Sequence, residues 1–173
     1  MKMKKTICMI MAVMSICTVA LAGCGGSNDS SASDSSSGTS AAAAQTDTVV
    51  DVAAVADKLK SDITYDDEVI ELNSAKIEKI VGVSADLYTA AKVYVGSSGA
   101  TPEEIDCFEA KDEASAAEIK TALEKRVESQ KAVFENYKPE QMPKLDNPVI
   151  IVNGKYVYLC VSGDNDKAKE IIG

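Results

Sequence analysis

Residues 149–161, with the sequence VIIVNGKYVYLCV, decide the fold of this chain. Asn153-Gly154 stands between two runs rich in β-branched and aromatic residues, and this dipeptide favours a tight type I′ turn. The second run alternates, so its side chains point to two opposite faces of a sheet. One face carries Tyr156, Tyr158 and Cys160, and the other carries Val157, Leu159 and Val161. The stretch therefore predicts a β-hairpin within an antiparallel sheet.

Two more strands and the longest helix are predicted upstream of this hairpin. Residues 92–95 and 105–110 have the composition of strands, and we expect them to pair through the loop between them. Within that loop, Thr101-Pro102-Glu103-Glu104 has the pattern of a helix start. Apolar positions that recur every three or four residues then predict a long helix, capped by Asp112 or Ser115. Its stripe consists of Ala116, Ile119, Leu123, Val127, Gln130, Phe134 and Tyr137.

Shorter helical patterns complete the domain. Residues 52–63 follow a cap at Asp47 or Thr48, residues 74–81 end at Gly82, and a last short helix follows Asp164. The resulting order is α-α-β-β-α-β-β-α, which predicts an α+β fold with a small antiparallel sheet of about four strands. We expect the helices to pack on one face of this sheet, over the valine and leucine side of residues 157–161.

The N-terminus has the pattern of an export signal. Three lysines within residues 1–5 precede a short apolar run, which ends in Leu21-Ala22-Gly23-Cys24. This motif resembles the lipobox of bacterial lipoproteins, in which the cysteine receives a diacylglyceryl group, with acyl chains such as palmitate, before cleavage. Residues 1–23 are therefore predicted to be a signal peptide and residues 24–46 a lipidated Cys24 with a flexible Gly/Ser/Ala linker. Residues 47–173 remain for a single domain held at the extracytoplasmic face of the cell membrane.

Composition excludes several classes of function. The chain carries 18 basic and 27 acidic residues, and cleavage after residue 23 takes the net charge from −9 to about −12. Nucleic-acid binding needs a basic surface, so no nucleic-acid partner is expected. The chain has no histidine and no tryptophan, which removes the commonest general base and the commonest metal ligand. Cys107 and Cys160 lie in apolar runs, where they fit either free buried thiols or a disulfide.

One loop is the candidate ligand site. The loop consists of Gly96, Ser97, Ser98, Gly99, Ala100 and Thr101. Its backbone N–H groups and hydroxyls suit an anion, but it matches neither a P-loop nor a dinucleotide motif, and an ordinary strand connection is the better explanation. Asp66-Asp67-Glu68 and Asp164-Asn165-Asp166 offer oxygen ligands for weak Ca²⁺ binding, although a solvated turn and helix capping explain them too. No catalytic residue, metal site or cofactor is predicted.

Three tyrosines suggest an interaction surface. Tyr94, Tyr156 and Tyr158 are expected to share a sheet face, either half-buried under helices or open to a partner. Because we expect the helices to cover the opposite face, we predict that the tyrosine face is the open one. An envelope protein would be the partner there.

Several stretches resemble one family of small lipoproteins, largely from Gram-positive bacteria, whose domain has no assigned function. The resemblance rests on the motif at 21–24, on VYVGSSGATPEE at 93–104, on RVESQ at 126–130 and on FENY at 134–137. It extends from Asp51 to the C-terminus and implies location and domain limits, without any catalytic or ligand residues.

The sequence thus predicts a membrane-anchored, non-enzymatic binding or accessory module of the cell envelope. Two alternatives stay open. One is a histidine-independent extracytoplasmic hydrolase, which a buried acid with a perturbed pKa in a cleft would support. The other is a small-ligand carrier, which would need an apolar pocket closed by the 96–101 loop.

Overall fold

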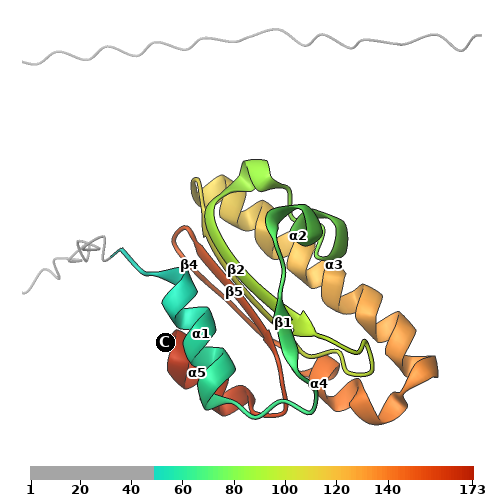
Figure 1. Cartoon of the computed structure of the whole chain (residues 1–173). Helices are drawn as coiled ribbons and strands as arrows, with labels where there is room; N and C mark the ends of the chain where they lie inside the picture. The colour runs from blue at the N-terminus through green and yellow to red at the C-terminus, as the bar shows by residue number, and fades with distance from the viewer. Residues whose placement is uncertain (1–48) are drawn as a thin grey trace, which may run out of the picture. The chain divides into compact units, whose positions relative to one another are not determined.

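The hairpin predicted at residues 149–161 is present and forms one side of a five-stranded antiparallel sheet (Figure 1). The computed structural model describes residues 49–173, and these belong to one unit, Thr46–Gly173. The strands run in the order β1-β2-β3-β5-β4 across the sheet. They are β1 (Val69–Glu71), β2 (Tyr88–Gly96), β3 (Glu104–Ala110), β4 (Val149–Asn153) and β5 (Tyr156–Val161). The predicted signal peptide, Cys24 and linker lie outside the described residues.

The α+β class is confirmed, and the strand number needs correction from about four to five. The additional strand is β1, which pairs antiparallel with the end of β2 and places Ile70 opposite Val95. A strand of three residues is too short to show a period of two in the sequence, so only its pairing reveals it. The predicted helix start at 101–104 is also wrong, because Glu104 is already the first residue of β3.

Within residues 49–173, five α-helices accompany the sheet. They are α1 (Val52–Asp62), α2 (Ser74–Ile80), α3 (Glu113–Tyr137), α4 (Met142–Asp146) and α5 (Asn165–Ile172), with 3-10 turns at Ala85–Leu87 and Pro139–Gln141. Side chains cap four of them from the residue before the helix: Asp51, Asn73, Asp112 and Asp164. Asp51, and not Asp47 or Thr48, caps α1, where its carboxylate accepts from the N–H groups of Ala53 and Ala54. The sequence did not predict α4, which spans five residues and has Pro143 in its first turn.

Helices cover both faces of the sheet, so the expectation of helices on one face is wrong. As predicted, α3 packs over the valine and leucine face, where Phe108, Leu123 and Leu159 share one core. α1 and α5 pack over the other face and bury Ile105, Cys107 and Cys160 in a second core (Figure 1). When both faces of a strand are buried, apolar residues occupy both faces, and the sequence no longer alternates clearly between apolar and polar residues. This is the pattern in β3 and β5.

The two cysteines are free thiols in the second core. Cys107 and Cys160 lie on adjacent strands and are both fully buried. Burial raises the pKa of both thiols above the ordinary value. They therefore act as small apolar side chains beneath α1, in agreement with one of the two interpretations of the sequence.

Within residues 49–173, no helix combines the length and the apolar character that crossing a membrane requires.

The hairpin offers a matched test of the core. Val157 and Val152 are direct partners across β4 and β5, but Val157 is fully buried and Val152 is 37% exposed. We expect Val157→Ala to lower the free energy of unfolding by roughly 2 kcal/mol, because two buried methyl groups are lost, and Val152→Ala to lower it by less than about 1 kcal/mol. Urea unfolding of residues 46–173 measures both. Equal losses would contradict the assignment of Val157 to the core.

Candidate functional site

A groove opens on the α3 side of the sheet, between α2, α3 and the loop at 96–101. We call it the loop groove. Its volume is about 720 Å³, within the range of small-molecule sites. The groove exists because α3 covers β3 and β5 but leaves the β1 edge of the sheet open. Its floor is formed by Ile70 and Leu72 from the β1 region, Val95 from β2 and Glu104 from β3.

Exposed apolar side chains gather at this groove. Among residues 49–173, six large hydrophobic residues are exposed, and Ile70, Ile80 and Val133 of these line the loop groove. Ile80, on the helix α2, is 39% exposed at the rim. Single exposed hydrophobic residues need no explanation, whereas several around one concave surface indicate a binding site.

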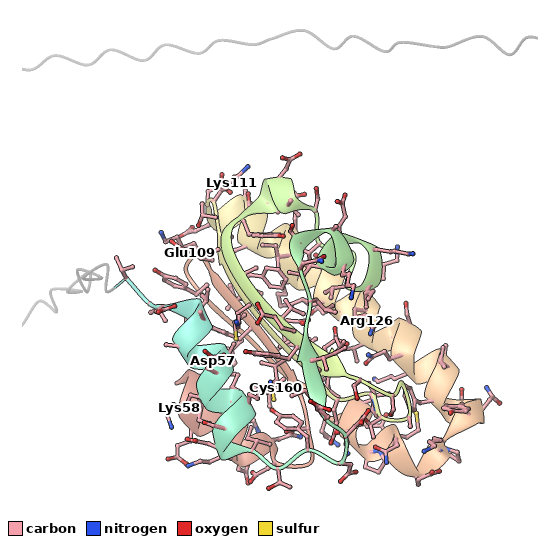
Figure 2. All side chains as sticks on the ribbon, viewed as in Figure 1. Asp57, Lys58, Glu109, Lys111, Arg126 and Cys160 are labelled. Carbon is pink, nitrogen blue, oxygen red and sulfur yellow. The ribbon has the colours of Figure 1, made fainter. Side chains whose placement is uncertain are left out.

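A buried ion pair forms the polar part of the groove. Arg126 projects from the middle of α3 (Figure 2), and its Nε lies 3.2 and 3.1 Å from the two carboxylate oxygens of Glu104. Its Nη2 donates a further hydrogen bond of 2.9 Å to Oε2. Gln130, one turn along α3, donates from Nε2 to the same oxygen at 2.8 Å. Glu104 is fully buried, so this fork of donors is what permits a carboxylate there.

A second carboxyl group lies behind the first. Asp106 is two residues after Glu104 on β3, and both are fully buried. Neither oxygen of Asp106 has a hydrogen-bond partner within residues 49–173. Burial, followed by the charge of Glu104, raises the pKa of Asp106 well above its ordinary value, and the charge of Arg126 opposes this rise. At neutral pH Asp106 therefore favours its protonated form, beside the carboxyl group that Arg126 and Gln130 bind.

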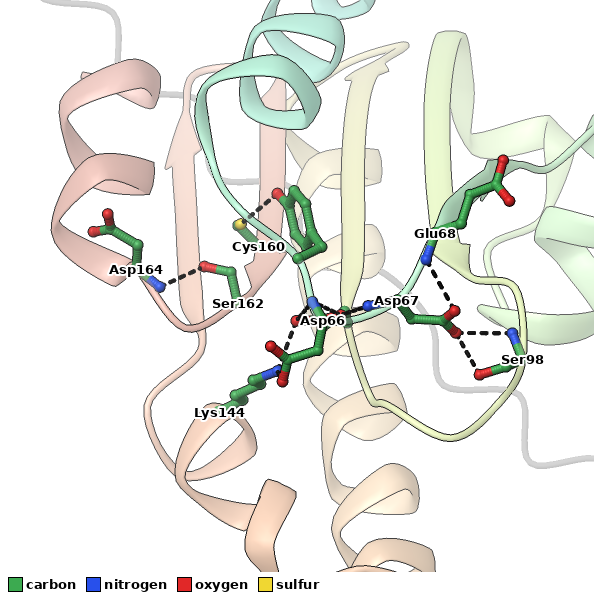
Figure 3. Close-up of polar contacts among 10 residues, drawn as sticks. Asp66, Asp67, Glu68, Ser98, Lys144, Cys160, Ser162 and Asp164 are labelled. Atoms are coloured by element: carbon green, nitrogen blue, oxygen red, sulfur yellow. Dashed lines mark hydrogen bonds and ion pairs between the residues drawn. The ribbon is translucent and has the colours of Figure 1, made fainter.

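The loop at 96–101 is held in place by the turn at residues 65–68 (Figure 3). Asp67 accepts hydrogen bonds from the backbone N–H of Ser98 at 2.8 Å and from its hydroxyl at 2.5 Å. These hydrogen bonds lower the pKa of Asp67. Glu103, two residues after the loop, is buried, and its carboxylate accepts hydrogen bonds from the backbone N–H groups of Asp66 and Asp67. The turn and the loop are thus joined at one end of the groove.

Lys144 completes this junction. Its ammonium group lies 2.6 Å from both Glu103 and Asp66. Burial alone would lower the pKa of Lys144, but the two carboxylates outweigh burial and raise it. Lys144 in turn lowers the pKa of Asp66. The short helix α4, which the sequence did not predict, is the element that delivers this lysine.

The candidate ligand loop therefore has a different role from the one expected. Gly96, Ser97, Ser98, Gly99 and Thr101 all line the loop groove, so the loop does border a cavity. Its donors, however, serve an anion of the protein itself, because Ser98 binds the carboxylate of Asp67. The loop forms a wall of the groove. The cationic residues of the groove lining are outside the loop, at Lys76, Lys79 and Arg126.

Comparison with protein families matches residues 61–162 to the domain of unknown function DUF4358. The chain belongs to this family. None of the curated proteins and none of the solved structures compared matches the chain. The matched span contains the whole lining of the loop groove, while most of α1 and all of α5 lie outside it. The groove is thus a feature of the DUF4358 domain proper.

The tyrosine surface predicted from the sequence is not open in the DUF4358 domain. Tyr94 and Tyr158 are 5% and 3% exposed, and they lie in the core beneath α1 and α5. Tyr156 is half-buried, and its hydroxyl accepts a hydrogen bond from the backbone of Val50. The prediction of an exposed face failed because it placed all helices on the opposite side of the sheet.

The acidic stretches considered for Ca²⁺ have partners in the protein. Asp164 caps α5 by accepting from the N–H of Lys167, as the capping interpretation requires. Asp66 and Asp67 hold Lys144 and Ser98, as described above. Within residues 49–173, no group of three or more potential ligands is arranged to hold a metal ion.

The sequence did not single out the central residues of this site. Arg126 and Gln130 were placed on the α3 stripe or in the resemblance, and Glu104 was assigned to a helix start. One signal was available: Gln130 is a polar residue at a core position of the helical stripe, which calls for a polar partner on the facing sheet. Glu104, which shares its parity in β3 with a second acid, Asp106, is that partner.

The buried acid predicts an unusual pH dependence of stability. Because its pKa is raised in the folded state, Asp106 keeps a proton that the unfolded chain releases above about pH 4. Its presence therefore destabilises the fold increasingly as pH rises above that value, by at most about 1.4 kcal/mol per pH unit. Asp106→Asn and Asp106→Leu both remove this titration, so the difference in unfolding free energy between each variant and the parent should shift in favour of the variant from pH 4 to pH 7. Urea unfolding across this range measures it, and a constant difference would contradict the buried titration.

Proposed function

We propose that this protein is a lipoprotein of the bacterial cell envelope whose DUF4358 domain is a non-enzymatic binding module, with the loop groove as its ligand site. The observation that carries the proposal is the composition of the groove. Three exposed aliphatic side chains and a buried, charge-paired cluster face one cavity of about 720 Å³. This combination of apolar walls and a few fixed polar groups is typical of small-molecule sites.

The groove supports the carrier alternative among the functions that the sequence left open. That alternative required an apolar pocket bordered by the 96–101 loop, and the loop does line such a groove. An envelope protein as partner is less well supported, since the tyrosine surface that suggested it is covered. The ligand is therefore proposed to be a small molecule.

Location rests on the N-terminal sequence. The lipobox-like motif at Leu21–Cys24 supports attachment through Cys24, and the Gly/Ser/Ala stretch to residue 46 supports a flexible tether to the extracytoplasmic face. A module tethered in this way meets ligands at or near the membrane surface.

A hydrolase that works without histidine is the second candidate. Asp106 has a raised pKa and lies two residues from Glu104, and enzymes often give two neighbouring carboxyl groups different environments. Against this, the carboxylate of Glu104 is fully engaged by Arg126 and Gln130. Asp106 is not part of the groove lining, so a substrate in the groove would not reach it. The binding module is therefore the better supported function.

The groove can be tested by filling it. Ser129 and Thr121 are both exposed on α3, and each hydroxyl bonds the carbonyl four residues earlier, but only Ser129 lines the groove. We expect fractions of a bacterial envelope extract to raise the melting temperature of the parent domain (residues 46–173) and of its Thr121→Trp variant. The melting temperature of the Ser129→Trp variant should stay unchanged. Equal responses in both tryptophan variants, or no response of the parent, would overturn the groove as ligand site.

Attachment to the membrane can be tested in the full-length protein. Cys24→Ala should incorporate no alkyne analogue of palmitate during growth and should keep the mass of its first 23 residues, because the lipidated cysteine is gone. Cys17→Ala lies within the predicted signal peptide and serves as the matched control, which should be labelled and cleaved normally. A labelled Cys24→Ala protein would refute the lipidation site.

A further inference from the structure

We propose that the loop groove binds a single-chain amphiphile with an anionic head group, of the alkyl phosphate or fatty acid class. This inference rests on the proposed function, since it names the class of ligand for the same site. Three observations support it: the charge of the groove, the unpaired polar atoms at one end, and the exposed aliphatic residues that continue from there along the groove.

The groove is electropositive in an acidic protein. Its lining has three cations, Lys76, Lys79 and Arg126, and two carboxylates, Glu103 and Glu104. Both carboxylates are already neutralised within the fold, Glu103 by Lys144 and Glu104 by Arg126. Lys76 and Lys79 form no ion pair with any other residue of 49–173. The chain as a whole carries −9, so two uncompensated lysines beside an apolar groove favour an anionic ligand.

The polar atoms lie at the end where α2 and α3 approach each other. A smaller cavity of about 230 Å³ adjoins the groove there and is lined by Lys79, Lys125 and Arg126 among others. Arg126 binds Glu104 through Nε and Nη2, and its Nη1 has no acceptor within residues 49–173. Three cationic side chains with an unused guanidinium donor suit a phosphate or carboxylate head group.

Gln130 supplies an independent sign of a ligand. Its side chain lines the groove, is only 7% exposed, and donates a hydrogen bond from Nε2 to Glu104. Its Oε1 has no hydrogen-bond partner in the described part of the chain. A buried amide oxygen without a donor is costly, and a hydroxyl or protonated phosphate oxygen of the ligand would satisfy it.

The aliphatic part of the groove follows the polar end. Val133 lies seven residues after Arg126 on the same helix, which separates the two by about 10 Å along α3. Ile70 and Ile80 stand across the groove from α3, and all three are more than a third exposed. Ile80 also lines the smaller cavity beside Lys79, so an alkyl chain running from Arg126 towards Val133 would begin beside Ile80 and cover all three. An inorganic anion alone would leave this apolar surface in water.

The test compares four probes of known chemistry. Decyl phosphate, decanol, decyltrimethylammonium and inorganic phosphate are titrated into residues 46–173 by calorimetry, below the micelle concentration of each amphiphile. We expect decyl phosphate to bind one to one and at least about tenfold more tightly than any of the other three, since it alone uses both ends of the groove. The preference should weaken with added salt.

Matched variants assign the two ends. Lys76→Gln with Lys79→Gln should bring decyl phosphate within about threefold of decanol, whereas Lys111→Gln with Lys169→Gln, which changes the net charge equally outside the groove, should keep the preference. Val133→Thr should weaken decanol and decyl phosphate alike, and Val152→Thr, exposed on β4, should weaken neither.

The outcomes separate this inference from the proposed function. If all three decyl probes bind equally and Ser129→Trp blocks them, the anionic class is wrong while the groove remains a ligand site. If none of the probes binds and an envelope fraction still stabilises the domain, the amphiphile is wrong and the binding module stands. If decyl phosphate binds Ser129→Trp as well as the parent, both the class and the site are refuted.

Discussion

The fork that Arg126 and Gln130 present to Glu104 is the interaction on which the α3 side of this domain depends. Glu104 begins the central strand β3 and is fully buried, so its charge is tolerable only with donors of fixed geometry. Removing Arg126 would leave that carboxylate unpaired at a cost of roughly 3–5 kcal/mol. The same contact fixes the rotation of α3 over the sheet, because two successive turns of the helix must face one carboxylate. The position of the groove follows from that rotation.

Register gives two neighbouring glutamates opposite tasks. Glu103 holds the turn at 65–68 together with Lys144, while Glu104 binds Arg126 of α3. Because side chains alternate along a strand, a slip of β3 by one residue would exchange these environments and separate both acids from their cations. The two glutamates therefore fix the register of β3. The turn at 65–68, which Glu103 binds, also positions the loop at 96–101.

The fold was predictable where local signals are strong and the site was not. The Asn-Gly hairpin, the α3 stripe from Ala116 to Phe134 and the caps at Asp112 and Asp164 follow from a few adjacent residues and are present, whereas Tyr137, the last residue of the predicted stripe, is 60% exposed. Strand β1 and the second covered face depend on pairing and packing between distant segments, which no period within one segment reports. The same holds for Glu104 and Arg126, separated by 22 positions. The exposed tyrosine surface failed for this reason, since α1 and α5 come from opposite ends of the domain.

The groove also shows why an acidic chain can still favour an anionic ligand. Net charge describes the surface as a whole, whereas binding depends on the charges that a ligand meets in low dielectric. Here Glu103 and Glu104 are neutralised inside the fold, so the groove presents Lys76, Lys79 and the free edge of Arg126. Apart from the buried Asp106, most of the remaining acids lie in solvent, where counter-ions screen them within about 8 Å. Buried ion pairs thus convert an acidic composition into a locally basic, half-apolar cavity, and this cavity is the most distinctive chemical feature of the described residues.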